Sequence, residues 1–193
     1  MKKWYLAIIL SILGVFAAAS STMAAPRAVP TKATDLHFNI APSGLGIVVD
    51  FHSPAGTGRG LRISLDGAFY FDDHFGAGVS AAYVFPLNPQ DPFKVALFGG
   101  IQGGIGEWSG YVPVVYIGGV AGFSFQADIN KDLTLTGEVT YAPAVGMHPN
   151  WTGYVFHGGY GLYLIYDVRS DLTINAGIRS LGWMPGFFIG FTF

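Results

Sequence analysis

The sequence predicts an all-β fold, a transmembrane antiparallel up-and-down β-barrel, and three observations indicate it. In the last seven residues, apolar Phe187, Ile189, Phe191 and Phe193 alternate with smaller or polar residues. The composition is 51% hydrophobic and 16% aromatic with only 11% charged residues, which is too apolar for an ordinary soluble domain. The same period-two alternation recurs along the chain, and a barrel in lipid needs an apolar outer face on every strand.

The N-terminal residues have the pattern of a cleaved secretory signal. Lys2 and Lys3 form a basic start, residues 4–19 are apolar, and a run of small residues follows up to Ala24. An uncleaved anchor helix is the less favoured alternative, because the apolar run is shorter than the ~20 residues that a span needs. We therefore expect a cleaved signal peptide at 1–24, a periplasmic lead-in at 25–35 and the barrel at 36–193.

Charge and cysteine content exclude several functional classes. Cleavage would remove two of the ten basic residues and none of the twelve acidic ones, so nucleic acid is not an expected partner. The chain has no cysteine, which excludes disulfides, lipid anchoring through cysteine and thiolate metal sites. The five histidines are too dispersed to predict a metal site, and no cofactor is expected. They are His37, His52, His74, His148 and His157.

We expect ten strands, with eight as the alternative, because an even number places both chain ends in the periplasm. The weakest candidate is 36–41, and the clearest is 61–71, where apolar and polar residues alternate throughout. In chain order the expected strands are 36–41, 45–52, 61–71, 75–85, 93–106, 114–127, 133–141, 154–168, 172–180 and 187–193.

Turn-forming residues separate these strands. Residues 86–92, 128–132 and 169–171 are expected to form periplasmic turns, whereas 72–74, 107–113, 143–152 and 182–186 are expected to face outside, with 143–152 as a loop. Residues 108–127 carry no charge and could be taken for a membrane helix. Their proline, glycines and β-branched residues favour a strand instead.

The polar face of each strand is expected to point into the lumen, because an Arg or Lys facing lipid at mid-depth costs about 2–4 kcal/mol. The expected lumen network is Asp50, Arg62, Asp66, Glu138, His157 and Arg179. Further inward candidates are Lys94, Gln102, Asp167 and Asn175. Such groups must pair or line water. Two interpretations stay open: a structural plug of ion pairs, or a small polar conduit or ligand site.

An enzyme is not expected. Lipid-modifying barrels need a Ser, a His and a carboxylate on the barrel wall, and the candidates are His52-Ser53, or His157 with Ser124 or Glu138. Neither has a recognisable nucleophile setting, so no catalytic residue is assigned. The expected function is a structural or narrow pore-forming, porin-like barrel. The alternatives are a lipid-modifying enzyme and a barrel that binds a small hydrophobic ligand.

Four short segments carry a family resemblance: Phe71-Asp72-Asp73-His74-Phe75, Val84-Phe85-Pro86-Leu87, the strand end 137–143, and Asn175-Ala176-Gly177-Ile178-Arg179. They are similar to the YfaZ-like family of small outer-membrane barrels of Gram-negative bacteria. The resemblance implies the cell outer membrane and defines no activity, and the signal-peptide pattern implies Sec-type export. The terminal Phe193 resembles the signal that the barrel-assembly machinery reads. Expected partners are the lipid bilayer, lipopolysaccharide and that machinery, with a small solute as a further candidate.

Overall fold

The computed structural model describes residues 33–42, 44–54, 59–71, 75–107, 113–156, 158–169, 172–181 and 184–192. The expected signal peptide at 1–24 lies outside the described residues, as do His157 and Phe193. Within the described ranges, no helix is long and apolar enough to cross a membrane.

The described chain folds into antiparallel strands that follow one another through turns, as the alternation predicted. The strands are β1 (Ala33–Ala41), β2 (Gly44–Pro54), β3 (Gly60–Tyr70), β4 (Phe75–Pro86), β5 (Phe93–Glu107), β6 (Pro113–Asp128), β7 (Leu133–Tyr141), β8 (Pro143–His148), β9 (Trp151–Phe156), β10 (Gly159–Arg169), β11 (Leu172–Leu181) and β12 (Met184–Thr192).

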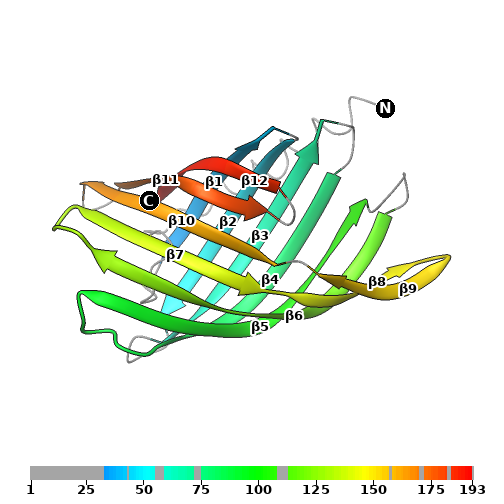
Figure 1. Cartoon of the computed structure of the whole chain (residues 1–193), viewed down its shortest axis with the longest axis horizontal. Helices are drawn as coiled ribbons and strands as arrows, with labels where there is room; N and C mark the ends of the chain where they lie inside the picture. Colours follow the sequence, from blue (N-terminus) through cyan, green and yellow to red (C-terminus); the bar gives the residue numbers. More distant parts are fainter. Residues whose placement is uncertain are drawn as a thin grey trace.

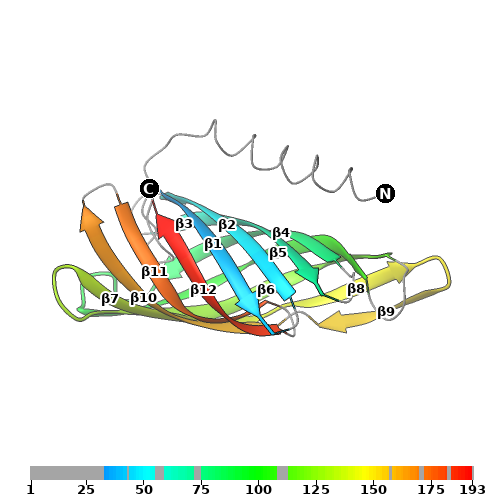
Figure 2. The ribbon, with the colours of Figure 1, turned by 90° about the horizontal axis from the view of Figure 1, so that it is seen from above.

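Ten of the strands close into a barrel (Figures 1 and 2). The ring runs β1-β2-β3-β4-β5-β6-β7-β10-β11-β12, and β12 returns to pair with β1. In that last seam Asp35 faces Thr192 and Ile40 faces Phe187. The predicted ten-strand antiparallel barrel is therefore confirmed, and the eight-strand alternative is wrong.

The other two strands, β8 and β9, lengthen barrel strands rather than add new ones. β7 and β8 pair with β6 in one continuous register, in which Ala121 faces Tyr141 and Val115 faces Met147. A single break at Ala142 separates the two halves. The β8–β9 hairpin therefore projects beyond the rim of the barrel, as the yellow strands of Figure 1 show.

The prediction of a loop at 143–152 is wrong. Residues 143–148 form β8, and β9 begins at Trp151, so only Pro149 and Asn150 make the turn. Pro143 suggested a loop, but it stands at the first position of β8, where the missing backbone N–H is tolerated.

β1 begins earlier than expected, because residues 33–35 belong to the strand and not to the lead-in. Its alternation is complete: Asp35, His37 and Asn39 are buried, whereas Phe38 and Ile40 are exposed. The first strand therefore contributes polar side chains to the interior, which the sequence interpretation did not include.

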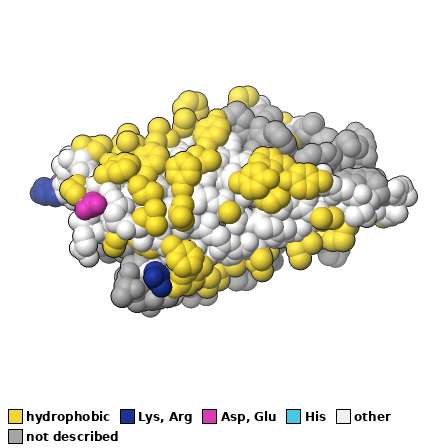
Figure 3. Space-filling view, turned by 60° about the horizontal axis from the view of Figure 1, so that its bottom comes forward, with side chains coloured by type: hydrophobic (Ala, Val, Ile, Leu, Met, Phe, Trp, Pro, Cys, Tyr) yellow, Lys and Arg dark blue, Asp and Glu magenta, His cyan; other side chains and the backbone are white. Residues whose placement is uncertain are grey.

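The outer surface of the barrel is apolar all the way round. Figure 3 shows one face, with hydrophobic side chains over its middle and charged ones only near its edges. Large exposed apolar side chains of this kind are normally buried in a soluble protein. Every strand of the ring contributes at least one: Ile40, Leu45, Phe69, Val79, Ile101, Ile117, Val139, Leu164, Ile178 and Ile189.

The interior has an apolar part along one wall. A cluster of buried side chains from β4, β5 and β6 and from the break after β7 packs there, made of Ala82, Val84, Ala96, Phe98, Val120 and Ala142. Large rings lie over inward-facing glycines, so that Tyr163 covers Gly161 and Phe98 covers Gly122. These glycines leave the space that the rings fill.

Candidate functional site

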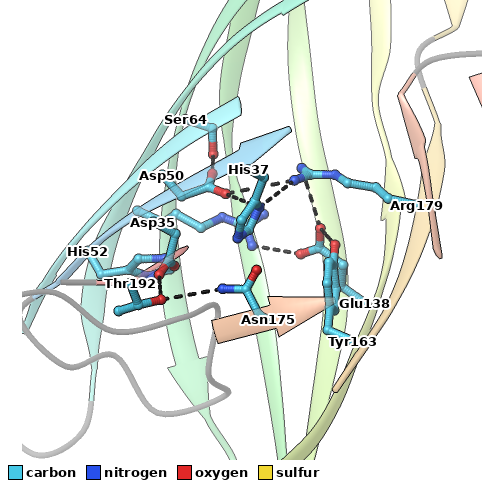
Figure 4. A network of polar contacts seen from close by, with 11 residues as sticks. Asp35, His37, Asp50, His52, Ser64, Glu138, Tyr163, Asn175, Arg179 and Thr192 are labelled. Carbon is cyan, nitrogen blue, oxygen red and sulfur yellow. Dashed lines mark hydrogen bonds and ion pairs between the residues drawn. The ribbon is translucent and has the colours of Figure 1, made fainter. Parts of the chain in front are cut away.

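Four charged residues from four separate strands meet inside the barrel: Asp50 of β2, Arg62 of β3, Glu138 of β7 and Arg179 of β11. Each lies on the inward face because side chains alternate along a strand. Figure 4 shows Asp50, Glu138 and Arg179 pointing toward one another from their different strands.

Glu138 is the centre of this cluster. Its Oε2 accepts a hydrogen bond from Arg62 Nη1 at 2.7 Å, and its Oε1 accepts one from the Tyr163 hydroxyl at 3.0 Å. Arg179 Nη2 lies 3.7 Å from Oε1. Because β3 and β7 are separated by three strands in one direction and five in the other, the Arg62–Glu138 bridge spans the lumen.

Asp50 is the second carboxylate of the network. It accepts a hydrogen bond from the Ser64 hydroxyl, and its Oδ2 lies 3.8 Å from Arg179 Nη1 and 4.0 Å from His37 Nδ1. Arg179 therefore joins Asp50 to Glu138, and the two ion pairs become one network across the barrel.

A further layer links β1, β2, β11 and β12 (Figure 4). The Thr192 hydroxyl donates to Asp35 Oδ1 at 2.6 Å and accepts from Asn175 Nδ2 at 3.4 Å, while His52 Nε2 lies 3.4 Å from Asp35 Oδ2. The sequence interpretation missed Asp35 and His52 as members of this network. The clean alternation of Asp35, His37 and Asn39 with apolar residues was the signal that could have identified β1.

Aromatic rings pack against the polar layers. The ring centroids of His37 and Phe188 are 5.2 Å apart, and those of Tyr163 and Phe188 are 4.8 Å apart. The Arg62 guanidinium also lies over the Phe98 ring, 4.5 Å from its centroid. These contacts fill the space between the charged groups, so the network is embedded in packed side chains.

Asp66 is close to the network but does not join it. Among the residues that the structure describes, its carboxylate makes no hydrogen bond and no ion pair. Of the six residues expected in the lumen network, the structure thus brings together Asp50, Arg62, Glu138 and Arg179. Asp66 lies apart, and His157 is outside the described residues.

The further inward candidates have other roles. Lys94 pairs with Asp128 at the end of β6, and Gln102 Nε2 donates to the Ala142 carbonyl at 3.1 Å. Asp167 accepts a hydrogen bond from the Thr173 hydroxyl at 2.9 Å. The Lys94 and Asp167 contacts tie neighbouring strands together, whereas the Gln102 contact reaches past β6 to the break between β7 and β8.

The Arg62–Glu138 bridge borders two cavities. One of about 140 Å³ has Asp66, Tyr116, Gln102 and Arg179 among its lining residues, and one of about 10 Å³ is lined by His52, Ser124 and Tyr163 among others. Arg62 and Glu138 line both cavities. The bridge therefore forms a wall that the two cavities share.

The structure separates one of the two residue sets expected as hydrolase candidates, while the other depends on His157, outside the described residues. His52 is buried on the inner face and Ser53 is exposed on the outer one, because adjacent strand residues point in opposite directions. They cannot act as a nucleophile and its base. In the described part of the chain, no group of three or more His, Asp or Glu side chains could hold a metal ion.

Comparison with known proteins identifies no family. No family model matches the chain, and no curated protein matches it either, so the resemblance to the YfaZ-like family is not confirmed. Among solved structures, the chain is similar to a KdgM porin and to a KdgM porin in complex with disordered oligogalacturonate. The identity is 13% in both cases, the TM-scores are 0.46 and 0.45, and each alignment covers 83% of this chain and 97% of the porin.

Proposed function

We propose that the protein is an integral outer-membrane barrel of porin-like architecture, whose lumen is closed by a charge-paired constriction and passes at most small ions. The observation that carries the proposal is the Arg62–Glu138 bridge, which spans the lumen and borders both of the cavities described above. Two features support the membrane location. The outer face is apolar, and a closed barrel satisfies the hydrogen bonds of its backbone without water.

The proposed partners are the lipid bilayer and lipopolysaccharide, and the barrel-assembly machinery that would read the terminal Phe193. Cleavage after Ala24 and Sec-type export belong to the same proposal. Deletion of Phe193 should lower the amount of barrel assembled in cells and leave refolding in detergent unchanged. Equal assembly in cells would argue against this role.

The constriction can be tested by conductance. The mature protein, refolded in detergent, should run at different positions on a cold gel with and without boiling, and it should show low or no conductance in planar bilayers. The double variant Arg62→Ser/Glu138→Ser removes the bridge, so its single-channel conductance should rise at least severalfold above that of the wild type.

The matched control is Lys131→Ser/Asp132→Ser, which removes an exposed ion pair of 3.6 Å in the β6–β7 turn. Its conductance should equal that of the wild type. Equal conductance of wild type and Arg62→Ser/Glu138→Ser would refute the constriction. Release of fatty acid from phospholipid or lipopolysaccharide by the wild type would favour the lipid-modifying alternative.

A further inference from the structure

The larger cavity contains a carboxylate that the network leaves unmatched. Glu138 is paired with Arg62, and Arg179 is shared between Glu138 and Asp50. Asp66 lines the same cavity, and among the described residues it has neither an ion pair nor a hydrogen bond. A carboxylate withdrawn from bulk water is costly unless a donor or a cation approaches it.

A second oxygen lies beside this carboxylate. The side chains of Asp66 and Tyr116 converge over Gly78 of β4, where an added methyl group would lie 2.6 Å from Tyr116 Oη and 2.8 Å from Asp66 Oδ1. At Gly104 of β5 the same methyl group would lie 2.6 Å from Tyr116 Cζ. The two glycines therefore make room for a pair of oxygen atoms that faces the cavity.

The volume of the cavity limits the size of a ligand. A cavity of about 150 Å³ in another protein holds benzene, which has six heavy atoms. The space of about 140 Å³ next to Asp66 is of that size. A ligand of roughly six heavy atoms or fewer fits it.

Charge selects the class of ligand. The described acidic residues of the lumen are Asp35, Asp50, Asp66 and Glu138, against two arginines, Arg62 and Arg179. Histidines apart, the lumen thus has more acidic than basic side chains among the described residues. An ion that enters this space and stops at Asp66 gains most if it is positive, because Asp66 has no direct ion pair among the described residues, although Arg179 lines the same cavity.

We propose that the larger cavity binds a small organic monocation, an alkylammonium of about six heavy atoms or fewer, with Asp66 as the counter-ion and Tyr116 Oη as a second acceptor. The inference deepens the proposed function, since it assigns a ligand class to one side of the same constriction. It also predicts that any current through the barrel is selective for cations.

Binding can be measured with three probes of one shape: n-propylammonium, 1-propanol and propionate. Saturation-transfer NMR on the full mature protein in detergent should detect n-propylammonium and give no signal for the other two. Asp66→Asn keeps the side-chain shape and removes the charge, and it should weaken n-propylammonium binding at least tenfold. Similar signals for all three probes, or unchanged binding by Asp66→Asn, would overturn the proposal.

Two further variants make the test specific. Gly78→Ala places a methyl group between Tyr116 and Asp66 and should weaken binding by a comparable factor without any change of charge. Asp91→Asn removes one negative charge in the exposed β4–β5 turn and should leave binding unchanged. The boiling-dependent gel shift establishes that each variant is folded. If Asp66→Asn does not refold, Gly78→Ala tests the site in its place.

The outcomes separate this inference from the proposed function. Unchanged conductance of Arg62→Ser/Glu138→Ser, together with n-propylammonium binding that depends on Asp66, would reject the constriction and keep the site. A rise in conductance without n-propylammonium binding would keep the constriction and reject the site.

Discussion

Glu138 holds the interior together through three neighbours, because Arg62 and Tyr163 donate hydrogen bonds to it and Arg179 lies 3.7 Å away. Its side chain is only 7% exposed and that of Arg62 is 11% exposed. Removal of one partner from a pair withdrawn from water leaves an uncompensated charge, which costs more than the pair itself is worth.

We therefore expect Arg62→Ala and Glu138→Ala each to lower the free energy of unfolding by about 3–5 kcal/mol. The double variant should lose less than the sum of the two, with a coupling of about 1–3 kcal/mol. Urea unfolding in lipid vesicles, followed by tryptophan fluorescence, measures all three values. The exposed Lys131–Asp132 pair is the control and should show a coupling below about 1 kcal/mol. Additive losses at Arg62 and Glu138 would contradict the network.

The pattern of the sequence could place these residues but not pair them. Period-two alternation put Asp50, Arg62, Asp66, Glu138 and Arg179 on the inward face without knowledge of the fold. The alternation could not predict that Asp66 would lie apart from the network, because the depth of a side chain in the lumen depends on the register between neighbouring strands.

Strands β8 and β9 are extensions of barrel strands and are not needed for closure. The ring closes through β7 and β10, in which Leu133 faces Tyr166 and Thr140 faces Gly159. β9 pairs only with β8 among the described residues. The hairpin therefore stands outside the hydrogen-bonded ring.

Replacement of residues 143–156 by a two-residue Asn-Gly turn should leave a folded barrel. We expect the boiling-dependent gel shift to persist, with a lower urea midpoint because β6 loses its pairing with β8. The control is removal of β12, residues 184–192, which breaks the ring between β11 and β1 and should abolish the shift. Loss of the shift in the hairpin variant would show that closure depends on the extension.

Over the whole molecule, polar side chains face the lumen and apolar side chains face outward. This arrangement predicts how a charged residue on the outer face changes the free energy of unfolding. Leu164 lies near the middle of β10 and is 50% exposed, while Leu87 lies in the β4–β5 turn and is 61% exposed. In a soluble barrel both positions would accept arginine at little cost, since surface substitutions stay within about 0.5 kcal/mol.

If the outer face contacts lipid, Leu164→Arg should lower the free energy of unfolding by about 2–4 kcal/mol, as an arginine at the middle of a bilayer does. Leu87→Arg should change it by less than about 0.5 kcal/mol. Urea titrations in lipid vesicles compare the two variants. Equal effects would contradict a membrane-embedded barrel.

Local pattern was enough for the architecture and for the inward face of each strand. The side-chain period of a strand is two residues, so the sequence predicted ten antiparallel strands, the apolar exterior and the inward face of Asp50, Arg62, Asp66, Glu138 and Arg179, four of which join the network. It began β1 three residues too late, and it failed at the β8–β9 hairpin. There, a short segment rich in proline and polar residues does not differ locally from a loop, and only the pairing of β8 with β6 makes it a strand.

The tertiary structure alone decided which charges meet. Arg62 and Glu138 are 76 residues apart, and Asp35 and Thr192 are 157 apart. Their contacts follow from the closure of the ring and from the register between strands, which bring distant side chains to one height in the lumen. Register is a property of strand pairs, so no single segment of the sequence contains it.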